Sequence, residues 1–474
     1  MNIVMEGHGC KTSIEQVLML FFPLSDDITI YSEYYEDGEE SVIVTKLRYN
    51  LQEASTTYRD IICREDPLRV RNFVKKGTFL TAKKLSDQSP PWGILTGIRP
   101  AKIATDLMAE GESDDDIRKL LKEECWVTDE KIDLTMSVAK KEFPILSQVK
   151  EKTVGLYIGM PFCPTRCLYC SFVSTSMEYL GKYLKPYLKC LEQEIKKTAE
   201  ILNELDFTVD TVYFGGGTPT TISSDQMDEL LNHLCSTIDL SMIREFTIEA
   251  GRPDTLSREK LRVLKRYPVT RLSINPQSMH QVTLDRIGRK HTPEDIVRAY
   301  EMAREEGFAD INSDVIAGLP GETPAMFSET LNKLKRLEPE GITVHTMYIK
   351  RASRLREEIQ NYRLTTPETV GEMLDISQRF MKEHGYKPYY MYKQKNTLGN
   401  HENIGFAKPG HESIYNILMM EEAQTIIGMG GGGVTKIVRH GKIDRIFNMK
   451  NADEYVNRID EMLERKDQIL DFYR

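Results

Sequence analysis

From residue 154 onward, short β-branched runs alternate with segments of helical period, and this alternation constrains the fold more than any other feature. The expected strands cover residues 154–160, 210–217, 245–250, 271–275, 310–318 and 341–348, with helical stretches between them. Strands that alternate with helices pair in parallel through right-handed crossovers. Six such units predict an α/β fold with an open, partial (β/α)6 barrel of the TIM type.

The predicted strands lead into residues that can bind a ligand. In parallel α/β folds, binding sites gather at the carboxyl ends of the strands. The first strand is followed by three cysteines and the second ends in a glycine-rich stretch, while later strand ends carry Glu249, Gln277 and Asp314. We therefore expect one binding site at the carboxyl-end opening of the barrel.

The barrel region, residues 151–364, is flanked by two segments whose residue patterns differ from the strand–helix alternation. Residues 1–150 combine a helical pattern near residues 12–22 with strand-like runs at 28–35 and 41–49, which predicts an N-terminal α+β extension. Residues 365–474 contain a helical pattern, an aromatic cluster, a glycine-rich turn and an amphipathic helix from about residue 452. We expect this last segment to be a substrate-facing C-terminal cap.

Composition excludes several classes of protein. The chain has 474 residues, of which 40% are hydrophobic and 28% charged, as in ordinary globular proteins. The longest apolar stretch near its start, residues 18–24, is far shorter than the roughly 20 residues of a membrane helix, and no basic signal segment precedes it. Lys and Arg total 63 against 72 Asp and Glu, which argues against a broad nucleic-acid surface. We expect a cytoplasmic protein with no membrane span and no nucleic-acid partner.

Three of the eight cysteines, Cys163, Cys167 and Cys170, are spaced C-x3-C-x2-C directly after the first barrel strand. Eight cysteines are too few for a disulfide-stapled secreted protein of this length, so a reducing compartment and a metal site are expected. A structural zinc site takes four ligands, and no fourth Cys or His lies within ten residues of the three. A 4Fe-4S cluster held by three thiolates keeps one iron open for a ligand. A zinc site completed from a distant part of the chain remains the alternative.

The motif C-x3-C-x-Y-C after a strand, with Tyr169 as its tyrosine, resembles that of the radical S-adenosylmethionine (SAM) superfamily. The resemblance implies a 4Fe-4S cluster whose open iron binds SAM. Reductive cleavage of SAM would then give a 5'-deoxyadenosyl radical, with the cofactors carrying the chemistry and the protein orienting them.

Over about 200 residues the match narrows to the oxygen-independent coproporphyrinogen III oxidase, or dehydrogenase, family and its haem-chaperone relatives. By this resemblance, Tyr157 orients the cofactor and the stretch Gly216, Gly217 and Thr218 contacts its methionine part. Glu249 would bind a first SAM molecule, and a second SAM site would be lined by Gln277, Arg289 and Asp314. The sequence departs from the group's pattern at residues 251–253 and 275–276, which lie beside these positions.

The N-terminal extension, the stretch at residues 90–102 and the glycine-rich tail look most like the HemZ-type branch of this family. The reaction implied is oxidative decarboxylation of two propionates of coproporphyrinogen III to vinyls, giving protoporphyrinogen IX in haem biosynthesis. It implies a tetrapyrrole substrate and a low-potential electron donor, a flavodoxin or ferredoxin. No catalytic acid or base is assigned. The alternatives are a haem chaperone, whose motif survives in part as His411 and Tyr415, and a radical enzyme acting on another tetrapyrrole.

Several weaker features complete the sequence hypotheses. Gly428, Gly430 and Gly433 have the spacing of a dinucleotide fingerprint, but the alternating residues after them predict a hairpin, so we expect a flexible turn near the substrate. Cations that could bind propionates follow the sixth strand, with a solvated helix start as the equally supported alternative: Lys350, Arg351, Arg354 and Arg356. His401 and His411 are candidate proton donors or haem contacts. Four tyrosines are candidates for stacking on a macrocycle, with a core role favoured: Tyr386, Tyr389, Tyr390 and Tyr392.

Overall fold

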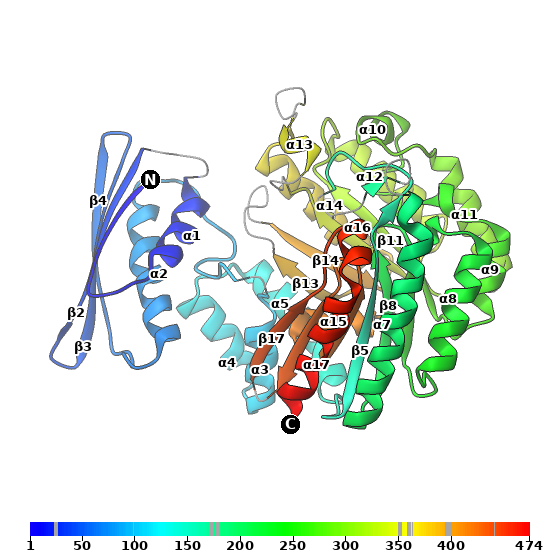
Figure 1. The fold of residues 1–474 in the computed structure, drawn as a ribbon. Helices are drawn as coiled ribbons and strands as arrows, with labels where there is room; N and C mark the ends of the chain where they lie inside the picture. Colours follow the sequence, from blue (N-terminus) through cyan, green and yellow to red (C-terminus); the bar gives the residue numbers. More distant parts are fainter. Residues whose placement is uncertain are drawn as a thin grey trace. The chain divides into compact units, whose positions relative to one another are not determined.

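The computed structural model of the protein describes residues 1–22, 27–97, 99–170, 175–176, 181–348, 353–357, 362, 364–393, 401–439 and 441–474. These residues form two compact units, 1–136 and 137–474 (Figure 1). The boundary between them falls within one helix, α5 (Asp129–Leu146). The three-part division expected from the sequence stays a prediction.

The first unit is an α+β assembly, as the sequence indicates. Its elements are β1 (Asn2–Glu6), α1 (Lys11–Phe21), β2 (Ile28–Asp37), β3 (Glu40–Tyr49), β4 (Gln52–Asp60), α2 (Pro67–Lys83), α3 (Lys102–Glu110), α4 (Asp114–Lys119) and a π-helical turn (Leu120–Glu124). The strands form one sheet in the order β1-β2-β3-β4, in which β1 pairs parallel with β2 and the other pairs are antiparallel. β4 has no run of apolar residues that would predict a strand. Its extended conformation therefore depends on the hydrogen-bonded pairing with β3.

The second unit contains the six predicted barrel strands in one sheet. They are β5 (Thr153–Met160), β8 (Thr208–Gly216), β9 (Glu245–Glu249), β10 (Arg271–Ser273), β11 (Ile311–Ala317) and β12 (Gly341–Thr346). Neighbouring strands pair in parallel and follow one another in chain order across the sheet. Most of their residues are buried on both faces, as expected for parallel strands covered by helices. The partial barrel predicted from the alternation is therefore confirmed.

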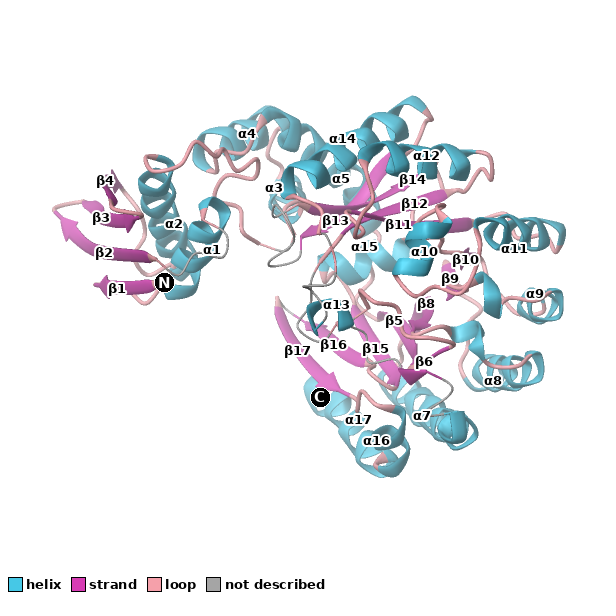
Figure 2. Ribbon diagram, turned by 90° about the horizontal axis from the view of Figure 1, so that it is seen from above, coloured by secondary structure: helices cyan, strands magenta, loops and turns pink. Residues whose placement is uncertain are grey.

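Helices connect these strands, and all but the short Gln281–Arg286 helix lie on the outer side of a curved row of strands (Figure 2). They are α7 (Leu184–Leu205), α8 (Ser224–Thr237), α9 (Arg258–Lys265), α10 (Gln281–Arg286), α11 (Pro293–Glu305) and α12 (Pro324–Lys335). Serine or threonine caps start four of them, and those at α8 and α11 form complete capping boxes. Single 3-10 turns occur at Gly181–Tyr183, Pro219–Thr221 and Pro253–Thr255.

The C-terminal residues add strands to both edges of the same sheet. β13 (Lys387–Lys393) and β14 (Glu402–Ala407) extend it antiparallel beyond β12. At the other edge, β15 (Thr425–Gly430) pairs parallel with β5 and continues into an antiparallel hairpin of β16 (Val434–Arg439) and β17 (Lys442–Phe447). The remaining elements are a small strand pair, β6 (Phe162–Cys163) with β7 (Thr175–Ser176), and the helices α13 (Arg354–Glu357), α14 (Pro367–Glu383), α15 (Ile414–Glu421), α16 (Ala452–Asn457) and α17 (Ile459–Tyr473).

The described part of the sheet stays open, because β13 and β17 are its two edges. Within the described residues, no helix has both the length and the apolar composition needed to cross a membrane.

The glycine-rich stretch of the tail packs against the strand that carries the cysteine loop. Gly430 has a φ of +79°, and a side chain there would collide with the carbonyl oxygen of Gly159. A side chain at Gly431 would lie 2.9 Å from Cγ of Pro161. These glycines therefore allow close backbone approach between β15 and β5. A strand, β16, and no helix follows them, which confirms the predicted hairpin and removes the geometry of a dinucleotide site.

Candidate functional site

The three cysteines follow β5: Cys163 ends the short strand β6, and Cys167 and Cys170 lie on the loop after it, which Leu168 holds at its centre. The amide of Leu168 donates to Ile287 O at 2.9 Å, and its carbonyl accepts from the Leu355 amide at 3.0 Å. The Leu168 side chain is buried in an apolar cluster with Ile287 and Leu355. One apolar anchor between Cys167 and Tyr169 thus fixes the loop, and all three cysteines line a single cavity of about 250 Å³ at the carboxyl ends of the strands.

The glycine-rich end of β8 runs along the cysteine-bearing segment. The amides of Gly217 and Thr218 donate to Met160 O and Phe162 O at 2.6 and 2.8 Å. A side chain at Gly217 would lie 2.5 Å from Phe162 O, and Gly216 has a φ of +106°, so both positions require glycine. Thr218 Oγ1 lies 3.4 Å from Cys163 Sγ. The bare backbone forms a cradle beside the cysteines.

Glu249, at the end of β9, is a buried carboxyl group facing the cavity. Its Oε1 accepts a hydrogen bond from the Tyr213 hydroxyl at 2.6 Å. Burial raises the pKa of Glu249 to about 7, and the charge of Asp314 adds to the increase, while the bond from Tyr213 opposes it. Glu249 can therefore exchange a proton near neutral pH.

Gln277 and Asp314 lie side by side, because Gln277 forms an isolated bridge to Val315 with a φ of +64°. The backbone amide of Gln277 donates to the backbone carbonyl of Asp314 at 2.9 Å, and Asp314 Oδ1 accepts from Asn312 Nδ2 at 2.9 Å. The Gln277 Oε1 atom is buried and has no hydrogen-bond partner among the described residues. An unpaired buried acceptor that faces a cavity is a place for a donor on a ligand.

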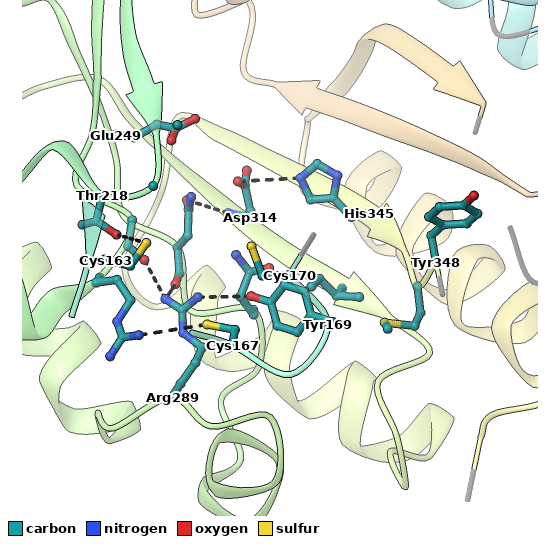
Figure 3. Close-up of a pocket in the computed structure, with 18 of the residues that line it drawn as sticks. Cys163, Cys167, Tyr169, Cys170, Thr218, Glu249, Arg289, Asp314, His345 and Tyr348 are labelled. Atoms are coloured by element: carbon teal, nitrogen blue, oxygen red, sulfur yellow. Dashed lines mark hydrogen bonds and ion pairs between the residues drawn. The ribbon is translucent and has the colours of Figure 1, made fainter. Parts of the chain in front are cut away.

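Arg289 connects the cysteine loop to the loops after β9 and β10. Its Nη1 donates to the Tyr169 hydroxyl at 3.3 Å, and Nη2 donates to Gly251 O and Asn275 O at 2.6 and 2.7 Å. Its Nε is buried without a partner in the described chain. The contact with Tyr169 is drawn in Figure 3.

The structure brings the predicted site residues together, with one exception. Tyr157 does not line the cavity. The centroid of its ring lies 6.3 Å from that of Tyr213, and the two rings are stacked. Its hydroxyl would lie 3.4 Å from a Cβ atom at Gly216, so Tyr157 packs against the glycine-rich end of β8. The other predicted residues line the cavity: Cys163, Cys167, Tyr169, Cys170, Gly216, Gly217, Thr218, Glu249, Gln277, Arg289 and Asp314.

Sequence reasoning did not select His345, which lies at the end of β12 and lines the same cavity. His345 Nε2 lies 3.6 Å from Asp314 Oδ2, and its Nδ1 lies 3.1 Å from the Tyr392 hydroxyl. Figure 3 shows His345 and Tyr348 well separated from Cys163. The position of His345 near the carboxyl end of a predicted strand is the sequence feature that indicates a site residue. Other lining residues that the sequence does not predict as site residues include Arg252, Asn275, Met347, Tyr348 and Asn403.

Several secondary candidates lie elsewhere. His411 pairs with Asp310 at 3.2 Å, and its carbonyl accepts from Arg271, so it lies at the amino ends of β10 and β11, opposite the cavity. The ring nitrogen Nε2 of His401 lies 3.2 Å from Pro367 O, and His401 does not line the cavity. Of the four tyrosines, Tyr392 lines the cavity and the others are buried in the core, as favoured. Lys350 and Arg351 lie outside the described residues, as does the side chain of Arg356, and Arg354 is exposed.

The donor set fits the expected cluster and SAM. The cavity presents three cysteine thiols, the glycine-rich end of β8, and buried polar atoms on Gln277 and Arg289 that have no partner in the described chain. Within the described residues, no three His, Cys, Asp or Glu side chains are grouped so that they could hold a single metal ion. This finding favours a cluster over a zinc ion at the three cysteines. Cys163, Cys167 and Cys170 would hold the cluster, and the polar residues around the cavity would hold the cofactor.

The raised pKa of Glu249 leads to a stability prediction for the metal-free protein. A carboxyl pKa that rises from 4.5 to about 7 on folding stabilises the fold below pH 4.5, and this contribution is lost as pH rises through 7. Glu249→Gln removes this loss, so its stability relative to wild type should increase by up to ~3 kcal/mol between pH 5 and pH 8. Thermal unfolding across this pH range measures the difference. A difference in stability between the variant and the wild-type protein that does not change with pH would contradict the prediction.

Comparisons with known proteins agree with the site. The family model described as the radical SAM superfamily matches residues 157–334. The chain is 43% identical over 386 residues to the oxygen-independent coproporphyrinogen-III oxidase-like protein HemZ of Bacillus subtilis, covering 80% of this chain and 77% of that protein. It is 33% identical over 310 residues to the haem chaperone HemW of the same organism, covering 64% of this chain and 76% of that protein.

A solved structure supports the fold. Coproporphyrinogen III oxidase (HemN) from Escherichia coli, a radical SAM enzyme, matches with a TM-score of 0.54 at 24% identity, covering 68% of this chain and 72% of that one. The chain therefore belongs to the radical SAM superfamily, whose members use a 4Fe-4S cluster and SAM, and within it to the family of the coproporphyrinogen oxidase-like protein HemZ.

Proposed function

We propose that this protein is a cytoplasmic, oxygen-independent coproporphyrinogen III dehydrogenase that converts two propionates of its substrate to vinyls. The observation that carries the proposal is the single cavity in which the three cysteines meet Glu249, Gln277, Arg289 and Asp314. The similarity to the coproporphyrinogen oxidase-like HemZ supports the substrate class. The low number of cysteines supports a reducing compartment.

When bound, the cluster and SAM supply an organic radical that can remove a hydrogen atom from a propionate β-carbon. Loss of carbon dioxide and one electron from that propionate would leave the vinyl group, so the reaction needs a one-electron acceptor in addition to the reductant of the cluster. A low-potential flavodoxin or ferredoxin would reduce the cluster. Each propionate thus loses one hydrogen atom, one electron and one carbon dioxide.

The protein's own residues have positioning roles in this proposal. Glycine at positions 216 and 217 lets the end of β8 pack against the backbone of residues 160–162, which places this end of the strand at the cavity and Thr218 beside Cys163. Glu249 and Asp314 line the cavity and would supply carboxylate acceptors for the hydroxyl or ammonium groups of SAM. His345 and Tyr348, on the part of the cavity away from Cys163, would face the substrate (Figure 3).

Haem delivery is the second candidate, and the similarity to HemW favours it. Its expected haem contact, His411, is paired with Asp310 at the amino ends of the strands. This placement separates it from the cysteine cavity, which supports the enzyme over the chaperone.

One anaerobic assay tests these proposals. The protein is reconstituted with iron and sulfide, then mixed with SAM, dithionite and coproporphyrinogen III, and 5'-deoxyadenosine and tetrapyrrole products are followed by chromatography. The proposal predicts that 5'-deoxyadenosine and a vinyl-bearing product rise together. Deoxyadenosine without a change in the tetrapyrrole would refute the substrate but keep the radical chemistry. If neither product forms, a haem titration that gives a one-to-one Soret shift dependent on His411 would support delivery.

A further inference from the structure

Arg252 lies just after β9, and its side chain is only 4% exposed. Its Nε and Nη2 atoms donate to the two oxygens of Asp254 at 2.9 and 2.8 Å. The Arg252 carbonyl accepts from Thr255 Oγ1 at 2.7 Å and from the Thr255 amide at 3.0 Å. Both the backbone and two edges of the guanidinium are therefore fixed in place.

The remaining nitrogen, Nη1, points to the cysteine loop. It donates to Thr165 Oγ1 at 2.8 Å and lies 4.0 Å from Cys167 Sγ. The charges of Cys167 and Cys163 both raise the pKa of Arg252, after the larger effects of burial, which lowers it, and of Asp254, which raises it. The dashed line at Cys167 in Figure 3 marks this contact. A fixed cation thus lies beside one cysteine of the predicted cluster.

Of the two arginines among the described residues that line the cavity, Arg252 is the one that contacts this thiol. Arg289, the other buried arginine of the cavity, donates to the Tyr169 hydroxyl and to backbone carbonyls. His291, 1% exposed, has a pKa lowered to about 3, first by burial and then by the charges of Arg289 and Arg252, and is therefore neutral at physiological pH. Asp254 is the anion paired with Arg252.

We propose that Arg252 is a positioning residue that raises the reduction potential of the 4Fe-4S cluster by holding a buried positive charge against the Cys167 thiolate. Reduction adds one negative charge to the cluster, and a nearby cation in a low-dielectric site stabilises that charge. Hydrogen bonds to cluster sulfurs and local charge are known determinants of cluster potential. The inference rests on the assignment of the cluster to the three cysteines and is independent of the substrate.

The test is an EPR-monitored redox titration of the reconstituted full-length protein, with iron and sulfide content measured on each sample. Arg252→Gln should shift the midpoint potential of the cluster to more negative values by about 60 mV, a tenfold change in the equilibrium of a one-electron couple. Arg252→Lys, which keeps the charge, should restore part of the shift. Arg262→Gln is the matched control, because Arg262 is 64% exposed and pairs with Glu306, and it should leave the potential unchanged.

Asp254→Asn separates charge from general damage to the site. It removes the paired anion but keeps one hydrogen-bond acceptor for Arg252, so it should shift the potential in the opposite direction, to more positive values. A shift in the same direction as Arg252→Gln, or no shift in either protein at full iron content, would overturn the proposal. If Arg252→Gln does not retain iron, Asp254→Asn decides alone, since a negative or zero shift contradicts the charge model. Wild-type protein that binds no cluster would instead refute the cluster assignment.

Discussion

Replacing Cys163, Cys167 or Cys170 by alanine is expected to abolish the reductive cleavage of SAM. Each cysteine supplies one of three thiolates, and the cluster keeps only one iron open when all three bind. Loss of one thiolate leaves a second iron without its protein ligand. Anaerobic reconstitution followed by chromatography of 5'-deoxyadenosine measures the effect, and each variant should give no more product than a sample without protein.

Two cysteines outside the cavity provide matched controls. Cys190 on α7 is buried, Cys235 on α8 is half-buried, and neither lines the cavity. Cys190→Ala and Cys235→Ala should keep the iron content and the deoxyadenosine yield of the wild-type protein. Continued deoxyadenosine formation by any variant of the cysteine loop would contradict the assigned cluster site.

The barrel could be predicted from the sequence because its signals are local. Each barrel strand is a short apolar run, and the intervening helices have periodic apolar faces and polar caps. The residues at the strand ends then fall on one side of the sheet without further information. Glu249, Gln277 and Asp314 lie more than 25 residues apart in the sequence and line one cavity for this reason.

The other part of the site depends on pairing between distant segments. Tyr392 and Asn403 reach the cavity because β13 and β14 extend the sheet antiparallel beyond β12. Asn403 also accepts a hydrogen bond from the Thr346 amide at 2.7 Å, which fixes this edge. No local pattern in the tail specifies that partner strand. No local pattern marks Arg252 as a site residue, because the residue that it contacts on the cysteine loop lies 85 positions away in the sequence.

A buried ion pair joins the C-terminal helix α17 to helix α7. Lys466 Nζ lies 3.1 Å from Glu194 Oε1, with side chains only 2% and 0% exposed. Lys466 also donates to Gly428 O at 2.6 Å. Glu194 Oε2 accepts from the Gly430 amide at 2.7 Å, and Oε1 accepts from Asn448 Nδ2 at 2.7 Å. The pair therefore holds the glycine-rich stretch that packs on Gly159 and Pro161, just before the first cysteine.

Lys466→Met is expected to destabilise the protein by ~3–5 kcal/mol, because it leaves the Glu194 charge buried without its counterion. The double variant Glu194→Gln with Lys466→Met should recover much of the loss, since the uncompensated charge is gone. Arg474→Met, which breaks an exposed pair with Glu204, is the control and should have little effect on unfolding. Denaturant unfolding measures all three proteins. Because the loosened stretch contacts the segment before Cys163, the reconstituted Lys466→Met protein should also release iron at a lower temperature than wild type. Unchanged stability and iron retention would show that the ion pair does not support the cysteine loop.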